Sequence, residues 1–142
     1  MKALINRDRI TEYIPQKAPI VMIDELLTCT DVEVISQLEV REDNMFVYEG
    51  EMTESGLIEN IAQTVAAKAG YECHQQQIPV PLGFIGAVSK VSIVQRPKVG
   101  SKIRTTVTIK NDVMGIMIIS GSSEEDGQPL AHCEMKIMIQ QG

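Results

Sequence analysis

One carboxylate stands near the start of a segment that otherwise reads as a buried helix, ESGLIENIAQTVAAKAG (residues 54–70). Glu59 is followed by Asn60 and by Gln63, and Gln63 lies one turn further along the same helical face as Glu59. A carboxyl group that faces a pocket can act as a general acid or base, or as a nucleophile. A carboxylate that faces water is an ordinary surface charge. The residues themselves leave both interpretations open.

The cysteines do not form a recognisable site. Cys29, Cys73 and Cys133 are odd in number and widely spaced, and the chain has no C-x-x-C pair. We therefore expect neither a disulfide framework nor a zinc site, but reduced thiols in a cytosolic protein. We expect no metal or organic cofactor.

The histidines are also placed where structural roles suffice. His132 alternates with the apolar residues Cys133 and Met135 on a predicted strand, so its side chain should point to solvent. His74 is expected beyond the end of the helix, where the helix dipole favours it. Tyr48, before the helix, could handle a proton only through its phenol, and a phenol is a poor base near neutral pH.

The remaining sequence predicts one helix and an antiparallel sheet. Residues 4–14 predict a short helix that stops before Pro15. The apolar segment 20–29 should turn at 30–31 and pair with strand 31–40. The helix should begin at the N-cap Thr53. Strands are predicted over 84–95, 101–110, 113–120 and 129–139, with hairpin turns at 111–112 and 125–127. The alternating apolar residues of strand 31–40 are Val32, Val34, Leu38 and Val40.

This order gives an α+β domain, with the helix against one face of one sheet. The helix positions expected to pack are Ile58, Ile61, Ala62, Val65, Ala66 and Ala69. We expect a single domain over residues 1–142.

Composition narrows the class of function. The chain carries a net charge of −6 with a pI near 4.9, which argues against general nucleic-acid binding. No apolar run approaches the roughly 20 residues that span a bilayer, and no apolar signal-peptide core stands at the N-terminus. We therefore expect a cytoplasmic protein without membrane or nucleic-acid partners.

Three segments resemble the β-hydroxyacyl-acyl-carrier-protein dehydratases. IPQKAPIVMIDELL (14–27) resembles their LPHRxPxxLVDRVL opening, and MTESGLIENIAQTVAA (52–67) resembles their MPGVLIxEAxAQ helix. GFIGAVSKVSIVQRPKVGSKI (83–103) resembles their LAGIDKARFKRPVxPGDQL strand and turn. The segments follow the family's order and spacing. The helix is also similar to GIEYMAQAxAAHAG of the dehydratase-like branch in aryl-polyene and flexirubin pigment pathways.

The resemblance implies a hotdog fold, in which a curled antiparallel sheet wraps one long central helix, and a dimer. It places the family's catalytic acid at Glu59 and implies that Gln63 holds the site by hydrogen bonding. Backbone N–H groups of Ser55 or Gly56 would bind the thioester oxygen, although the family's glycine falls at Glu54. Phe84, Ile85 and Gly86 would line an acyl tunnel.

The family's catalytic histidine is missing. A gap-free count back from Glu59 places the histidine of the family's GHFP motif at Met45, and thioethers do not move protons. The histidine of the opening PH pair is Gln16 here.

A run of bases fits an acyl-carrier partner. Between residues 90 and 104 the chain has five bases and no acid, namely Lys90, Arg96, Lys98, Lys102 and Arg104. We predict that Arg96, Lys98, Lys102 and Arg104 dock an acidic acyl carrier protein or the phosphates of coenzyme A. A solvated strand face explains the same run equally well.

These observations favour a lyase of fatty acid or polyene biosynthesis that dehydrates β-hydroxyacyl thioesters. It would be active by itself or be the histidine-lacking subunit of a dehydratase, so both a homodimer and a heterodimer with a second hotdog subunit stay open. A thioesterase that uses Glu59 alone, or a non-catalytic acyl-binding protein, are the alternatives.

Overall fold

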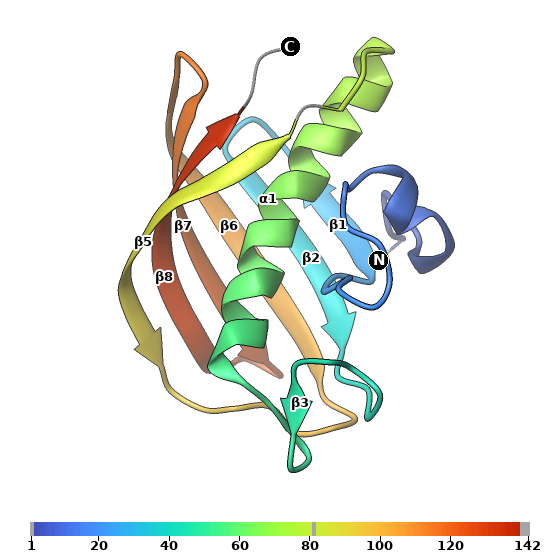
Figure 1. The fold of residues 1–142 in the computed structure, drawn as a ribbon, viewed down its shortest axis with the longest axis vertical. Helices are drawn as coiled ribbons and strands as arrows, with labels where there is room; N and C mark the ends of the chain where they lie inside the picture. The colour runs from blue at the N-terminus through green and yellow to red at the C-terminus, as the bar shows by residue number, and fades with distance from the viewer. Residues whose placement is uncertain (1, 81, 140–142) are drawn as a thin grey trace.

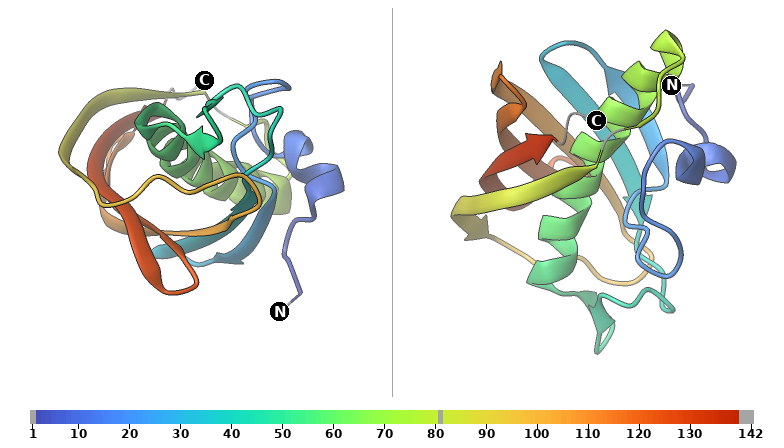
Figure 2. Two further views of the ribbon diagram at one scale, coloured as in Figure 1. Left: turned by 90° about the horizontal axis from the view of Figure 1, so that it is seen from below. Right: turned by 45° about the horizontal axis from the view of Figure 1, so that its top comes forward.

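The computed structural model describes residues 2–80 and 82–139. A six-stranded antiparallel sheet curls around one long helix, α1 (Glu54–Gln76), as the hotdog prediction requires (Figure 1; Figure 2, left). The strand order is β1-β2-β6-β7-β8-β5. The bounds are β1 (Glu25–Cys29), β2 (Glu33–Glu39), β5 (Gly83–Ile93), β6 (Lys102–Val113), β7 (Ile116–Glu125) and β8 (Gln128–Ile139).

Two small elements complete the domain. The short strands β3 (Val47–Tyr48) and β4 (Glu51–Met52) form a hairpin just before α1. A 3-10 helix, η1 (Arg7–Glu12), replaces the longer helix predicted over residues 4–14. Within the described residues, no helix is both long and apolar enough to cross a membrane.

The start of α1 agrees with the sequence. Thr53 is the N-cap, and its side-chain oxygen accepts a hydrogen bond from the Gly56 N–H at 3.4 Å. The helix ends at Gln76, and the C-cap Gln77 has a left-handed conformation with a φ of 58°. His74 therefore lies in the last turn of α1, which corrects the prediction that it follows the helix.

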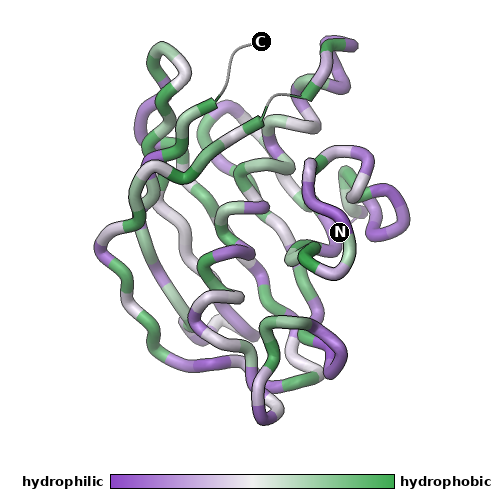
Figure 3. Tube along the Cα trace, in the orientation of Figure 1, coloured by the Kyte–Doolittle hydropathy of each residue, from purple (hydrophilic) through white to green (hydrophobic). Residues whose placement is uncertain are grey.

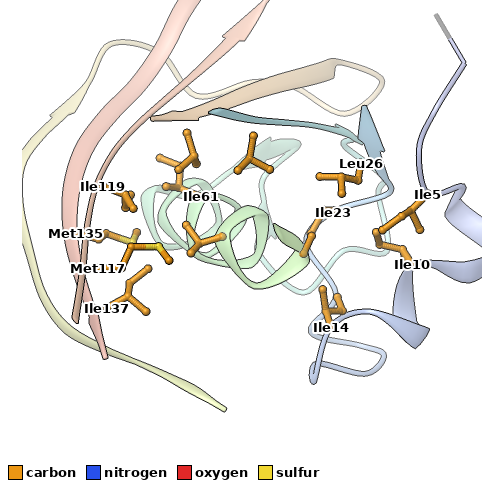
Figure 4. Close-up of a cluster of buried hydrophobic side chains, with 14 of the residues drawn as sticks. Ile5, Ile10, Ile14, Ile23, Leu26, Ile61, Met117, Ile119, Met135 and Ile137 are labelled. Carbon is orange, nitrogen blue, oxygen red and sulfur yellow. The ribbon is translucent and has the colours of Figure 1, made fainter. Parts of the chain in front are cut away.

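The core lies between α1 and the concave face of the sheet. Ile61 of α1 points toward Ile119 of β7 and Met135 of β8, and all three side chains are buried (Figure 4). On the other flank of the helix, Ile23 and Leu26 pack in the same cluster. Because the aromatic content is only 4%, branched aliphatic residues and methionines fill this space.

Two glycines allow other parts of the chain to lie unusually close to α1. A Cβ at Gly121 of β7 would overlap the side chain of Ile61, so glycine lets the helix settle on the sheet. A Cβ at Gly70 of α1 would overlap the backbone carbonyl of Tyr13. The segment that follows η1 is thus pressed directly against the helix.

The hairpins show one confirmed turn and one wrong one. Asp126 and Gly127 both have positive φ, 49° and 81°, and connect β7 to β8 as predicted. The β6–β7 turn lies at Met114 and Gly115, not at residues 111–112. A bulge near Lys110 shifts the register and lets β6 continue through the polar pair.

The predicted turn after β1 is confirmed, with one error at its edge. The Thr30 hydroxyl accepts hydrogen bonds from the N–H groups of Val32 and Glu33. Val34 is buried as predicted, but Val32 belongs to the turn and is 60% exposed.

Candidate active site

A cavity of about 300 Å³ lies against α1. Its walls come from α1, from the beginning of β5, from the end of β8 and from the segment that follows η1. Among the described lining residues, only Glu59 and Gln16 have polar side chains. The lining is Pro15, Gln16, Glu59, Ala62, Val65, Ala66, Ala69, Val80, Gly83, Phe84, Ile85, Ile137 and Ile139. The alanines of α1 therefore form an apolar wall that leads away from a single carboxylate.

Glu59 is half-buried at this cavity. Its Oε1 accepts a hydrogen bond from Gln63 Nε2 at 2.8 Å. Its Oε2 has no hydrogen-bond partner among the described residues. Glu59 is thus neither fully exposed nor fully buried, and its catalytic role stays a prediction.

Gln63 is completely buried beneath Glu59. Its Oε1 accepts from the Met22 N–H at 2.6 Å, and its Nε2 also donates to the Ile20 carbonyl at 2.7 Å. Its hydrogen bonds fit the supporting role that the resemblance implied, and Gln63 has no exposed surface and does not line the cavity. Its side chain joins Glu59 to the segment Ile20–Met22.

Asn60 secures the same segment from the neighbouring helix position. Its Nδ2 donates to the Met22 carbonyl at 2.8 Å, and its Oδ1 accepts from the Thr105 hydroxyl of β6 at 2.5 Å. Both backbone groups of Met22 are therefore bound by side chains of α1. Sequence reasoning did not assign this role to Asn60.

Ser55 and Gly56 lie outside the cavity. Gly56 is buried, and a Cβ there would come within 2.7 Å of Phe46 and 2.8 Å of Met52. Its N–H already donates to Thr53. Ser55 is exposed in the first turn of α1. Binding of a thioester oxygen by either residue stays a prediction.

The predicted acyl wall is only partly on the cavity. Phe84 and Ile85 line it and remain 53% and 45% exposed. Gly86 does not line it, and a Cβ there would meet Met138 of β8 at 3.1 Å. Met45, at the position of the family histidine, is 55% exposed in the loop between β2 and β3. Gln16, at the other histidine position, does line the cavity, and its buried Oε1 has no hydrogen-bond partner among the described residues.

The five bases do not form one basic surface. Arg96 pairs with Glu54 at the start of α1, and Lys90 lies 3.6 Å from Glu134. Lys102 and Arg104 belong to β6. Glu39 of β2 is the cross-strand neighbour of Lys102, and Glu124 of β7 is that of Arg104. Lys98 bridges to Glu51 through the backbone, close to the start of α1. The fold thus brings Arg96 and Lys98 to the helix N-terminus and leaves Lys102 and Arg104 beside acids.

Neither histidine belongs to the cavity. His132 Nδ1 lies 2.9 Å from the Ser122 hydroxyl on the outer face of the sheet. His74 Nε2 lies 3.0 Å from the Glu12 carbonyl, and its ring packs against Tyr13. Both positions agree with the structural roles expected for them.

Burial raises the pKa of all three thiols. Burial raises the pKa of Cys29 to about 11, with a further contribution from the Glu72 carboxylate. Burial alone raises the pKa of Cys133 to about 11. In the part of the chain that the structure describes, no cluster of His, Cys, Asp and Glu side chains could hold a metal ion.

Comparison with known proteins identifies relatives of the whole domain. Residues 8–141 match the sequence model of the ApeP-like family, described as ApeP dehydratase. Among curated proteins, none matches this chain.

Solved structures with the same fold have low sequence identity. A chain of the dehydratase heterocomplex ApeI:P from Xenorhabdus doucetiae superposes with a TM-score of 0.86 at 19% identity, over 93% of this chain and 91% of that one. A hypothetical thioesterase from Streptococcus pneumoniae, solved with coenzyme A, superposes with a TM-score of 0.63 at 11% identity, over 82% of this chain and 84% of that one. The predicted hotdog fold is therefore confirmed.

Proposed function

This chain belongs to the ApeP-like dehydratase family, and we propose that it is the histidine-lacking subunit of a dehydratase for β-hydroxyacyl thioesters. One observation carries the proposal. The apolar cavity has Glu59 as its only ionisable side chain among the described lining residues. Such a site can supply one of the two proton-transfer groups that the reaction requires, but not both.

The elimination requires an acid and a base at the same time. The base removes the α-proton, the C–O bond at the β-carbon breaks, and the departing oxygen takes a proton from the acid to leave as water. Glu59 supplies the acid. A histidine on a second hotdog subunit accepts the α-proton.

The free edge of β5 supports a partner at this place. β5 pairs only with β8, so its other edge is unpaired in the described structure. Phe84, Ile85, Val88 and Val91 are exposed along it, and the first half of the strand is hydrophobic in Figure 3. An exposed apolar strand edge is a template for pairing with another strand. Since β5 also borders the cavity, a second subunit docked here would reach the site of Glu59.

We further propose that an acyl carrier protein presents the substrate near the start of α1. Arg96 and Lys98 lie there, and Lys102 and Arg104 of β6 extend the same docking role despite their acidic neighbours. A coenzyme A thioester is the alternative, because its phosphates would seek the same bases. A high salt concentration should weaken either interaction, because salt screens exposed charges. The screening length is about 10 Å at 0.1 M ionic strength and becomes shorter as salt is added.

Reconstitution tests the proposal. The chain, a histidine-containing hotdog subunit and their mixture are assayed with a β-hydroxyacyl thioester by enoyl absorbance. We expect activity in the mixture, and a loss on the order of 10²–10⁴-fold with Glu59→Gln. Glu33→Gln, at an exposed acid of β2, is the matched control. An inactive mixture, or full activity of Glu59→Gln, would reject the proposal.

A thioesterase is the second candidate. A single carboxylate can act as base or nucleophile in thioester hydrolysis, and the similarly folded Streptococcus pneumoniae protein is described as a hypothetical thioesterase. Release of free thiol by this chain alone, lost in Glu59→Gln, would favour this reaction over dehydration.

A non-catalytic acyl-binding role makes a different prediction. Glu59→Gln would then leave function intact, whereas changes at Phe84 or Ile85 would alter acyl binding.

A further inference from the structure

The turn between β6 and β7 carries an amino acid that does not suit its backbone. Met114 and Gly115 both have positive φ, 55° and 80°, and two-residue hairpin turns of this kind favour asparagine followed by glycine. The left-handed region crowds the Cβ of methionine, and the Met114 side chain is 95% exposed, so it gains little from packing within the described chain. An unfavourable backbone conformation that packing does not explain indicates a functional constraint on the side chain.

An exposed apolar row continues from this turn across the outer face of the sheet. Val113 of β6 lies opposite Ile116 of β7, and Ile116 lies opposite Met138 of β8. All three are exposed, whereas Met117, next to Ile116, is buried on the concave face, so the row points outward. Phe84 of β5 lies opposite Met138 and extends the row to a fourth strand. In Figure 1 the β6–β7 hairpin projects at this end of the sheet.

Basic side chains lie behind the row on the same face. Lys136 precedes Met138 by two residues on β8, which places it about 7 Å from the row along the strand. Further back, Lys110 lies 2.8 Å and Lys90 lies 3.6 Å from Glu134. Three lysines and one carboxylate leave this area two positive charges in excess, although the whole chain has a net charge of −6.

The acid of the hairpin faces the other way. Asp112 lies opposite Met117, on the concave side of the sheet, and lines a separate pocket with Lys68 and Glu72. The outer face of the sheet therefore has apolar side chains at its end and positive charge behind them.

We propose that this end of the sheet binds the surface of an anionic lipid bilayer. Peripheral membrane elements bury apolar side chains about 5–10 Å deep and place basic residues at the headgroups, which fits the spacing between the row and Lys136. A projecting turn enters a lipid surface without needing a matching groove. The inserted side chains are Val113, Met114, Ile116 and Met138. This contact is peripheral, it is independent of the proposed dehydratase role, and it revises the expectation that the chain has no membrane partner.

Vesicle co-sedimentation of the full chain tests the proposal. The vesicles contain phosphatidylcholine alone, or equal parts of phosphatidylcholine and phosphatidylserine, at low and high salt. We expect binding to the anionic vesicles only, weakened by salt. Met114→Asn should weaken it roughly tenfold to a hundredfold, and Lys136→Gln about fivefold. Val94→Asn, at an exposed apolar residue beyond the opposite end of β5, is the matched control and should bind as the unmodified chain does.

Met114→Asn also separates lipid binding from folding. Because asparagine suits the positive φ of this turn, the variant should unfold at the same or a higher urea concentration than the unmodified chain. A lower urea midpoint would refute the mismatch between methionine and the turn. Vesicle binding equal to that of the unmodified chain, or an equal loss in Val94→Asn, would overturn the proposal.

The same reagents distinguish a protein on this surface from a lipid. Self-association of the unmodified chain that Met114→Asn abolishes would assign the surface to a second copy of the chain. Loss of vesicle binding on addition of a histidine-containing hotdog subunit would assign it to that subunit. Either result, or no binding to the anionic vesicles, overturns the lipid contact.

Discussion

Gly70→Ala should destabilise this protein, although the same change inside a helix normally stabilises. Alanine is favoured over glycine in a helix interior by about 1 kcal/mol. Here the added Cβ would overlap the Tyr13 carbonyl, and a backbone atom cannot rotate away as a side chain can. Overpacking of this kind costs about 1–3 kcal/mol, and more where nothing yields. We expect a net loss of roughly 1–2 kcal/mol.

The assay is urea unfolding of the purified chain. With a slope of about 1–3 kcal/mol per molar urea, this loss lowers the midpoint by roughly 0.3–2 M. The shape of the cavity should also change, because Pro15 and Gln16 follow Tyr13 closely in the chain and form one of the cavity walls. A fluorescent acyl probe should therefore bind more weakly.

A matched pair of variants shows the ordinary sign in the same helix. Gln75 is exposed on α1, so Gln75→Gly should be less stable than Gln75→Ala by up to about 1 kcal/mol. If Gly70→Ala raises the midpoint as helix propensity alone predicts, the contact between α1 and the Tyr13 backbone is refuted.

Three further outcomes follow from the fold. Gly121→Ala should lower the free energy of unfolding by about 1–3 kcal/mol, and Ile61→Ala should lower it by about 2–5 kcal/mol. In urea unfolding, the double variant should lose less than the sum of the two, because the new methyl group occupies space that the Ile61 side chain vacates. Strict additivity would show that the two residues do not touch. Thr53→Ala should lower stability by about 0.5–2 kcal/mol through loss of the N-cap, measured by thermal unfolding. Because the pKa of Cys29 is raised to about 11, its alkylation by iodoacetamide should stay slow at pH 8 and accelerate as the pH rises toward 11; rapid alkylation at pH 8 would contradict this.

Local patterns carried most of the fold. Thr53 marks the start of α1, and the Asp126–Gly127 turn has the residue types that positive φ requires. The β6–β7 turn was missed because a bulge near Lys110 changes the count of residues along β6. A single sequence has no local signal for such a bulge, since it depends on how the partner strand is aligned.

The carboxylate of the candidate site was predictable from the sequence, but the hydrogen bonds that hold the segment beside it were not. The resemblance of the helix pointed to Glu59, and the structure places it on an apolar cavity with Phe84 and Ile85. The hydrogen bonds of Gln63 and Asn60 to Met22 join residues about 40 positions apart in the chain. Which backbone groups meet those amides is decided only when the segment before β1 packs on the helix.

The neighbours of the basic run could not be predicted from the sequence. Five bases stand without an intervening acid between residues 90 and 104, but strand pairing brings Glu39, Glu124 and Glu134 alongside some of them. Charge along the sequence is therefore a poor guide to charge across a sheet, where neighbours come from other strands.

The edge of β5 that is unpaired in the described structure also bears on how much of this protein a cell could maintain. If the chain has the second subunit proposed above, a chain made in excess of that partner presents an eleven-residue strand with exposed apolar side chains, and such edges invite aggregation between copies. Unassembled chains would be removed by proteolysis or lost as aggregate, whereas assembled chains would persist. The amount of this protein would then follow the amount of its partner, and the ratio of the two would be corrected after synthesis by the stability of the strand edge itself.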